Sequence, residues 1–312
     1  MKVLTASSNP RSPPMIRNFL SSGCVVLALV TMAATTPAAA SSPSPTRYYL
    51  ALGDSVAYGF QTDKALAGLP PRAFDTGYVD MLAARLARRR PGIATVNYSC
   101  PGESTVSFRI SCGWRDSGHL LHDDYPGAQQ TAALAFLRHH RGKVGLITLS
   151  LNGNDINDVV RACANDLGCL QREAPAAVGQ YAGRIRSILA QLRAAAPAAE
   201  IIVVGAYNPN VGAFAFSDPL FASVNVAQAT ASAADRARFA DPFPVFNPQD
   251  DAAVETAAIC ALTLICTRND SHPSDAGYRA LAAIIWQAAD LGSAEEGQRP
   301  RNRNLAVRLP GG

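Results

Sequence analysis

Four short polar segments of this 312-residue sequence carry side chains that could do nucleophilic chemistry. They are the segments 53–55 (GDS), 100–104 (CPGES), 152–155 (NGND) and 269–273 (NDSHP). A serine hydroxyl is a poor nucleophile until a base takes its proton, and a histidine on a loop is a suitable base. We therefore expect Ser55 to be a nucleophile and His272 to be its general base.

Each segment taken alone also has an ordinary structural interpretation. Ser55 could be a helix N-cap, which is the default role of a serine between a strand and a helix. Gly102 could be a turn residue, Asn154 could form a turn through its side chain, and His272 could be a surface histidine. These interpretations give no reason for all four segments to fall at strand ends or loop tips, and the joint pattern favours a site.

The elements that must position these segments alternate along the chain. Short runs rich in β-branched and aromatic residues alternate with alanine-rich stretches whose apolar residues recur at helical spacing, as in βα units. We expect strands at 48–52, 94–98, 145–150, 201–206 and 243–246, and helices at 77–90, 128–140, 176–196 and 275–292. The strands are continuously apolar, which is typical of a parallel sheet buried on both faces. Ligands of such sheets collect at the carboxyl ends of the strands, where the polar segments should meet.

The first forty residues differ from the rest. Lys2, Arg11 and Arg17 precede an apolar run at 24–32, and small residues follow up to Ala40, which predicts a secretory signal peptide over 1–40 and a secreted, extracellular protein. The run is shorter than the roughly 20 apolar residues that span a bilayer, so no stable membrane span is expected. A compact signal begins more naturally at Met15 than at Met1.

The remaining chain predicts a single domain. Its composition of 48% hydrophobic and 17% charged residues is that of a globular protein with a substantial core. We expect a linker at 41–46, one domain over 47–292 and a disordered tail over 293–312. Removing residues 1–40 takes away three positive charges and no negative ones, so the net charge falls from +4 to +1. This small net charge argues against nucleic acid as a partner. Separately, we expect the protein to be a monomer.

Six of the seven cysteines lie beyond the signal and form three sequence-near couples. The couples are Cys100 with Cys112, Cys163 with Cys169, and Cys260 with Cys266. Disulfides in an oxidising compartment follow, and nearest-neighbour closure is the simplest of the roughly 15 possible pairings. A zinc site is the competing interpretation, but the sequence has no C-x-x-C or H-E-x-x-H motif. We therefore expect no metal and no organic cofactor.

The motifs "GDSVAYGF", "NYSCPGEST", "LNGND" and "DSHPSDAGY" occur in this order. With them the sequence, from about Tyr48 to Gln287, resembles the SGNH (GDSL) hydrolase family, and most of all its secreted, disulfide-containing actinobacterial esterases and lipases. The resemblance implies an α/β, three-layer α/β/α flavodoxin-like fold with a central, mostly parallel five-stranded sheet. It also implies a secreted serine esterase or lipase acting on a small-molecule or lipid ester.

The resemblance assigns roles to individual residues. Ser55 would be the nucleophile and His272 the base, and an oxyanion hole would consist of the Ser55 N–H, the Gly102 N–H and the Asn154 side-chain amide. The family places an aspartate three residues before the histidine, where this sequence has Asn269, while Asp270 lies two before. Either Asp270 reaches the imidazole through a different loop conformation, or a backbone carbonyl orients His272 in a Ser-His dyad. Asn152 also replaces the first glycine of the family's G-x-N-D motif.

Other functions compete with ester hydrolysis on this resemblance. The same fold could serve a carbohydrate deacetylase, and the displaced aspartate favours a non-catalytic binding module. An α/β-hydrolase is a weaker interpretation, because its nucleophile elbow requires G-x-S-x-G and the last position here is Ala57.

Overall fold

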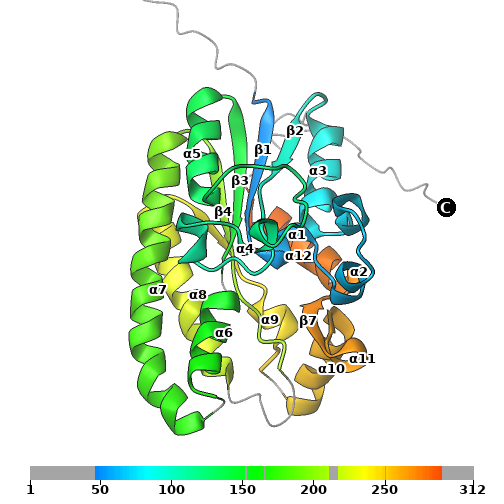
Figure 1. The fold of residues 1–312 in the computed structure, drawn as a ribbon, viewed down its shortest axis with the longest axis vertical. Coiled ribbons are helices and arrows are strands. Elements are labelled where there is room, and N and C mark those ends of the chain that lie inside the picture. The colour runs from blue at the N-terminus through cyan, green and yellow to red at the C-terminus, as the bar shows by residue number, and fades with distance from the viewer. Residues whose placement is uncertain (1–45, 152, 165, 211–216, 250, 290–312) are drawn as a thin grey trace, which may run out of the picture. The chain divides into compact units, whose positions relative to one another are not determined.

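The computed structural model describes residues 46–151, 153–164, 166–210, 217–249 and 251–289. At its centre lies a five-stranded sheet in the order β2-β1-β3-β4-β5, with every neighbouring pair parallel. The strands are β1 (Tyr48–Gly53), β2 (Ala94–Asn97), β3 (Val144–Ser150), β4 (Glu200–Val204) and β5 (Arg238–Ala240). The predicted fold class is thereby confirmed (Figure 1).

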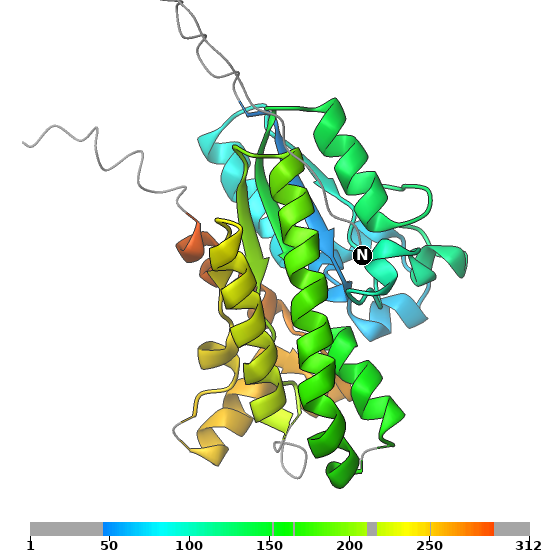
Figure 2. The same cartoon turned by 90° about the vertical axis from the view of Figure 1, so that its left-hand side faces the viewer.

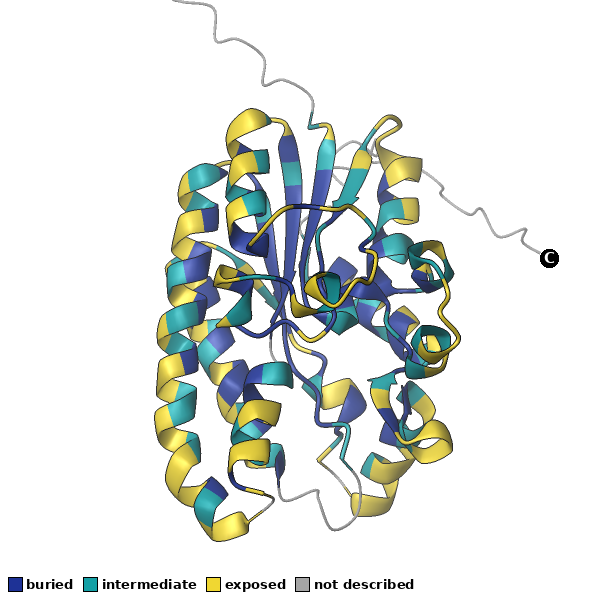
Figure 3. Ribbon diagram, in the orientation of Figure 1, coloured by how far each residue is buried: buried dark blue, intermediate teal, exposed yellow. Residues whose placement is uncertain are grey.

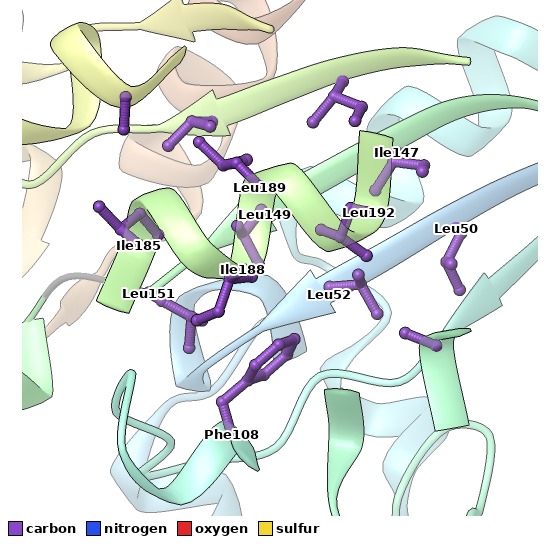
Figure 4. Packing of buried hydrophobic residues seen from close by; sticks show 14 of the residues in the cluster. Leu50, Leu52, Phe108, Ile147, Leu149, Leu151, Ile185, Ile188, Leu189 and Leu192 are labelled. Carbon is purple, nitrogen blue, oxygen red and sulfur yellow. The ribbon is translucent and has the colours of Figure 1, made fainter. Parts of the chain in front are cut away.

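Helices cover both faces of the sheet because its strands are apolar on both faces. Along β1, Leu50 and Leu52 belong to one buried cluster, while Tyr49 and Ala51 belong to the other. The first cluster is closed by α5 (Gln129–His139), α7 (Leu167–Ala195) and α8 (Asp218–Ala234), and the second by α3 (Tyr78–Arg89) and α12 (Asp275–Ala288). Figure 2 shows the first face, and Figure 4 shows Leu52 of β1 close to Leu192 of α7, with Leu50 farther along the strand. The buried strands lie between helices whose outer faces are exposed (Figure 3).

The remaining elements are short and gather around the carboxyl ends of the strands. They are α1 (Ser55–Tyr58), α2 (Thr62–Leu66), η1 (Pro71–Phe74), η2 (Ser107–Arg109), α4 (Gly113–Asp116), α6 (Gly153–Ala162), α9 (Phe243–Phe246), α10 (Ala252–Leu262), β6 (Thr263–Leu264), α11 (Ile265–Arg268) and β7 (Asp270–Pro273). β6 and β7 pair antiparallel in a small second sheet just before α12. Short helices and strands thus flank the loops that carry the polar segments.

The prediction of a strand at 243–246 is wrong. Residues 243–246 form the short helix α9, and the fifth strand is β5, which ends at Ala240. Prolines at 242 and 244 explain the difference, because proline lacks the N–H that a strand donates and is favoured in the first turn of a helix. The helix expected at 176–196 begins earlier, at Leu167, and Pro175 lies inside it.

Three predicted segments lie largely or wholly outside the described residues. They are the signal peptide at 1–40, the linker at 41–46, of which only residue 46 is described, and the tail at 293–312. Within the described part of the chain, no helix is both long and apolar enough to cross a membrane.

Candidate active site

Ser55 lies where β1 ends and α1 begins, and it is not the cap of that helix. The cap is Asp54, whose side chain accepts a hydrogen bond from the Val56 N–H at 3.0 Å. Ser55 is therefore the first helical residue, and its hydroxyl is not engaged in capping. Gly53 is required just before it, because φ is +134° and a Cβ there would lie 2.0 Å from the carbonyl oxygen of Ser150.

The side chains of Ser55, His272 and Asp270 form a continuous chain of hydrogen bonds. Ser55 Oγ lies 2.9 Å from His272 Nε2, and His272 Nδ1 lies 2.6 Å from Asp270 Oδ1. The serine and the histidine are 217 residues apart in sequence. The geometry is that of a nucleophile, a base and a carboxylate that orients the base.

The backbone at Asn269 explains how an aspartate only two residues before the histidine reaches its ring. Asn269 ends α11 with φ +50° and ψ +39°, a left-handed conformation that asparagine tolerates better than most residues. β7 begins immediately afterwards, and Asp270 Oδ1 also accepts the His272 backbone N–H at 3.1 Å. Of the two alternatives that the sequence leaves open, the structure has the carboxylate, and not a backbone carbonyl, at Nδ1.

The Asp270 carboxylate is buried, with 4% of the residue exposed. Its second oxygen, Oδ2, accepts the Thr62 N–H at 2.8 Å. Burial alone would raise the pKa of this carboxyl, but the hydrogen bond and charge of His272, with the N–H groups of Thr62 and His272, outweigh burial and hold the pKa well below its usual range. Asp270 is therefore ionised at neutral pH and available to stabilise a protonated imidazole.

Side chains that sequence reasoning missed hold the histidine loop in place. Tyr207, in the loop after β4, donates its hydroxyl to the Ser271 carbonyl at 2.9 Å, and the Phe60 ring packs against the His272 ring with centroids 4.7 Å apart. Gln61 Nε2 donates to the Pro273 carbonyl at 3.3 Å. Two signals in the sequence could have pointed to them: Tyr207 follows a strand, and Phe60 ends the "GDSVAYGF" motif.

Gly102 lies on the loop after β2, close to Asn154 at the start of α6. Asn154, in the first turn of α6, donates its side-chain amide to the Glu103 carbonyl at 2.8 Å, next to Gly102. Gly102 has φ +84°, and a Cβ there would meet no atom within 4 Å. The glycine is thus explained by its backbone conformation, and not by crowding from the protein. Asn152, the other departure from the family motif, lies outside the described residues.

Asp155 anchors this pair of loops, and sequence reasoning also missed it. Its carboxylate accepts the Thr105 N–H at 2.8 Å and the Thr105 hydroxyl at 2.5 Å, and Arg184 of α7 donates to it at 3.2 Å. A buried carboxylate that receives three donors fixes the loop carrying Gly102 relative to α6. The aspartate that follows the asparagine in "LNGND" is the signal that could have revealed it.

The three disulfides join the nearest cysteines, as predicted: Cys100–Cys112, Cys163–Cys169 and Cys260–Cys266. The first lies two residues before Gly102. Cys100, Cys112 and Glu103 are the one group in the described part of the chain whose atoms are close enough and of the right types to hold a metal. Their sulfurs are bonded to each other, so they are not thiolate ligands, and a zinc site does not fit here.

A cavity of about 980 Å³ lies between α6, α7, α8 and the segment 265–269. None of the described residues that line it carries a charge, and its walls include Leu170, Val178 and Leu220. Asn269, the neighbour of Asp270, is also in the wall, whereas Ser55, His272 and Asp270 are not among the described residues that line the cavity.

Solved structures share this fold. The chain is similar to a lipase from a goat rumen metagenome (16% identity, TM-score 0.52, 78% of this chain and 98% of the other), to phospholipase A1 from Streptomyces albidoflavus (18%, 0.50, 78% and 100%) and to an acetylxylan esterase from Geobacillus stearothermophilus (16%, 0.50, 79% and 95%). At these identities the likeness shows the fold alone. None of the curated proteins compared with the sequence matches it. The model of the GDSL-like lipase/acylhydrolase family matches residues 51–280, most of the chain, and the protein therefore belongs to this family of ester-bond hydrolases.

Proposed function

We propose that this protein is a secreted serine esterase or lipase that hydrolyses carboxylic esters through Ser55, His272 and Asp270. The observation that carries the proposal is the chain of hydrogen bonds from Ser55 Oγ through the imidazole to Asp270, at 2.9 and 2.6 Å. Both distances are within hydrogen-bond reach, which is the geometric requirement for a base that takes the serine proton.

The reaction follows from these contacts in two steps. Ser55 Oγ attacks the acyl carbon while His272 Nε2 takes the hydroxyl proton, and the imidazolium then gives that proton to the leaving alcohol as the acyl-serine forms. A water molecule next gives a proton to His272 and attacks the acyl carbon. The bond from the acyl carbon to Ser55 Oγ then breaks, the imidazolium returns the proton to Oγ, and the acid leaves. Asp270 stays ionised and stabilises the imidazolium in both steps. No metal or organic cofactor takes part.

Three donors are proposed to hold the oxyanion. The Ser55 N–H lies at the N-terminus of α1, the Gly102 N–H belongs to a loop anchored by Asp155, and Asn154 supplies a neutral amide that does not titrate. Asn154 Nδ2 bonds to the Glu103 carbonyl, which orients the amide and leaves its second N–H for substrate.

Apolar acyl groups are the substrates that the uncharged cavity favours. Its lining beside Asn269 suits an alkyl chain better than a hydrated sugar. No described feature specifically favours a carbohydrate deacetylase. The displaced aspartate was the reason to consider a non-catalytic module, and its 2.6 Å contact with His272 removes that reason.

Activity on a panel of p-nitrophenyl esters from acetate to palmitate tests the proposal, with Ser55→Ala as the control. Hydrolysis that is lost in Ser55→Ala and rises with acyl length supports it. Hydrolysis confined to acetate, or greater on acetylated xylan, would favour the deacetylase. Secretion and the monomeric state are tested on protein from the culture medium, whose N-terminus is expected at Ser41 and whose mass by light scattering is expected to be that of one chain.

A further inference from the structure

Glu103 is a buried carboxyl to which the proposed mechanism gives no role. Only 1% of it is exposed, and its Oε1 has no hydrogen-bond partner among the described residues. It lies against the Cys100–Cys112 disulfide, with a carboxylate oxygen and both sulfurs within 4.8 Å of one another. In the described part of the chain no cation pairs with it. An ionised carboxylate in such a place is strongly disfavoured, so the neutral acid is the stable form.

The contacts of Glu103 reach each of the three proposed oxyanion donors. Its backbone carbonyl accepts the Asn154 amide at 2.8 Å, and its chain neighbour is Gly102. Its Oε2 accepts a hydrogen bond from Gln129 Nε2 at 3.1 Å.

Gln129 continues this connection to the strand that carries the nucleophile. The Gly53 N–H donates to Gln129 Oε1 at 2.6 Å, and Gln129 Nε2 donates to the Gly53 carbonyl at 2.9 Å. Gln129 is fully buried, and Gly53 lies two residues before Ser55. One amide therefore joins the Glu103 carboxyl to the backbone on which the Ser55 N–H is placed.

We propose that Glu103 is a positioning residue for the ester hydrolysis proposed above. As a neutral acid it keeps the Gly102 loop and the Gln129 side chain in their positions relative to each other. Loss of its proton disturbs the oxyanion hole. The proposal rests on the proposed function, because the hole matters only if Ser55 forms an acyl intermediate.

The groups that face Glu103 agree with a neutral acid. Burial raises its pKa to about 7; the hydrogen bond from Gln129 and the nearby Ser107 hydroxyl act against burial, and the charges of Asp54 and Asp116 raise the pKa further. Tyr125 also faces it, and its own pKa is raised beyond the physiological range, so it stays neutral. The nearby cation Arg115 pairs with Asp116 and donates to the Tyr125 carbonyl. The proton of Glu103 is thus the one that changes near neutral pH in this set.

The pH profile of the full secreted chain and of Glu103→Gln tests the proposal. Glutamine has the same shape and cannot ionise. Because His272 is the same base in both proteins, wild-type kcat is compared with that of Glu103→Gln at each pH. Relative to the variant, the wild type should show an alkaline fall of about tenfold between about pH 6 and about pH 9 with little change in KM, because one or more oxyanion donors move away. At about pH 6 the kcat of Glu103→Gln should be within about threefold of wild type.

Glu255→Gln is the matched control. Glu255 is a partly buried glutamate whose pKa is also raised by burial, and it bonds to Asn247. This variant should keep the alkaline fall. A wild-type kcat that stays level to about pH 9 relative to that of Glu103→Gln would overturn the role of Glu103 while leaving ester hydrolysis intact. Absence of ester hydrolysis by the wild type at every pH would instead overturn the proposed function, and this inference with it.

If Glu103→Gln does not fold, infrared titration of a protein that retains Glu103 carries the test. The stretching band of a buried protonated carboxyl should disappear in parallel with kcat. Asp80, whose pKa burial raises to about 6, would contribute a second band, so the titration uses the Asp80→Asn background. A band that is already absent at about pH 6 would show that Glu103 is ionised and would overturn the proposal.

Discussion

Replacing Asp270 with asparagine should lower kcat severely and leave the fold intact. Both carboxylate oxygens accept hydrogen bonds, Oδ1 from the ring and backbone of His272 and Oδ2 from the Thr62 N–H. An asparagine has only one side-chain oxygen. Whichever way its amide turns, its NH₂ group faces an N–H donor, and the negative charge beside the imidazolium is lost.

The magnitude follows from the contact between Asp270 and His272. A charge-assisted hydrogen bond at 2.6 Å contributes about 1.5–3 kcal/mol. Since about 1.4 kcal/mol corresponds to tenfold in rate, losing this term alone lowers kcat by about 10- to 150-fold. A wrong imidazole tautomer lowers it further, and in a serine protease triad the same substitution lowers kcat about 10⁴-fold. We therefore expect a decrease between about 10²-fold and about 10⁴-fold.

Steady-state hydrolysis of a p-nitrophenyl ester measures this effect. Asp275→Asn is the matched control, because Asp275, the first residue of α12, accepts from Gln61 Nε2 at 3.2 Å and has no hydrogen bond to His272. It should keep kcat within about twofold of wild type. If Asp270→Asn also keeps kcat within about threefold, Asp270 does not support the base, and a backbone carbonyl orients His272 instead.

Three further predictions concern the neighbouring loops. Asn154→Ala should lower kcat about 10²- to 10³-fold at nearly constant KM, whereas the exposed Asn157→Ala should not; a rise in KM with kcat retained would remove Asn154 from the oxyanion hole. Replacing both Cys100 and Cys112 with serine should lower stability by about 3 kcal/mol and also reduce kcat at 25 °C; a lower Tm with unchanged kcat would make the disulfide purely structural. The pKa of Glu103 is about 7 in the folded state, above its ordinary value of 4.5, so the folded state binds one more proton than the unfolded state between these pH values. Wild-type stability should therefore fall by up to about 3 kcal/mol as pH rises from about 4 to about 8. Urea unfolding at the two pH values checks this, and the same fall in Glu103→Gln would refute it.

Asp270 changes the pH dependence of stability in the opposite direction, at acidic pH. The pKa of Asp270 is lower in the folded state than in the unfolded one, so its contribution to stability is fully present above the unfolded value, near pH 4, and is lost as pH falls through the folded value. Acid unfolding of Asp270→Asn should lack this component.

Most of the fold could be predicted from the sequence, because buried parallel strands leave continuous apolar runs. Four of the five strands lie where such runs predict them. β5 could not be predicted because it is only three residues long and begins at a charged residue, Arg238. The aromatic residues of Phe243–Phe246 favoured a strand there instead, but the segment is a helix. The first turns of α7 could not be predicted, because Pro175 normally ends or begins a helix, whereas here the helix begins after the N-cap Asp166.

The site was predictable in its residue types but not in its contacts. Ser55 and His272 are single residues within recognisable motifs, and the structure brings them together. The partner of His272 could not be predicted, because it depends on one left-handed residue, Asn269. Glu103 and Gln129 were missed because they act through the backbone of Gly53, and a backbone contact leaves no pattern in the sequence.

Labelling with a fluorophosphonate is the most direct test of the claim that Ser55 is an activated nucleophile. Only a serine whose proton is taken by a base reacts rapidly with this reagent. Peptide mass spectrometry should locate a single label on Ser55, with no label in Ser55→Ala and greatly slowed labelling in His272→Ala. An unlabelled wild-type protein, or a label on a different serine, would contradict the mechanism.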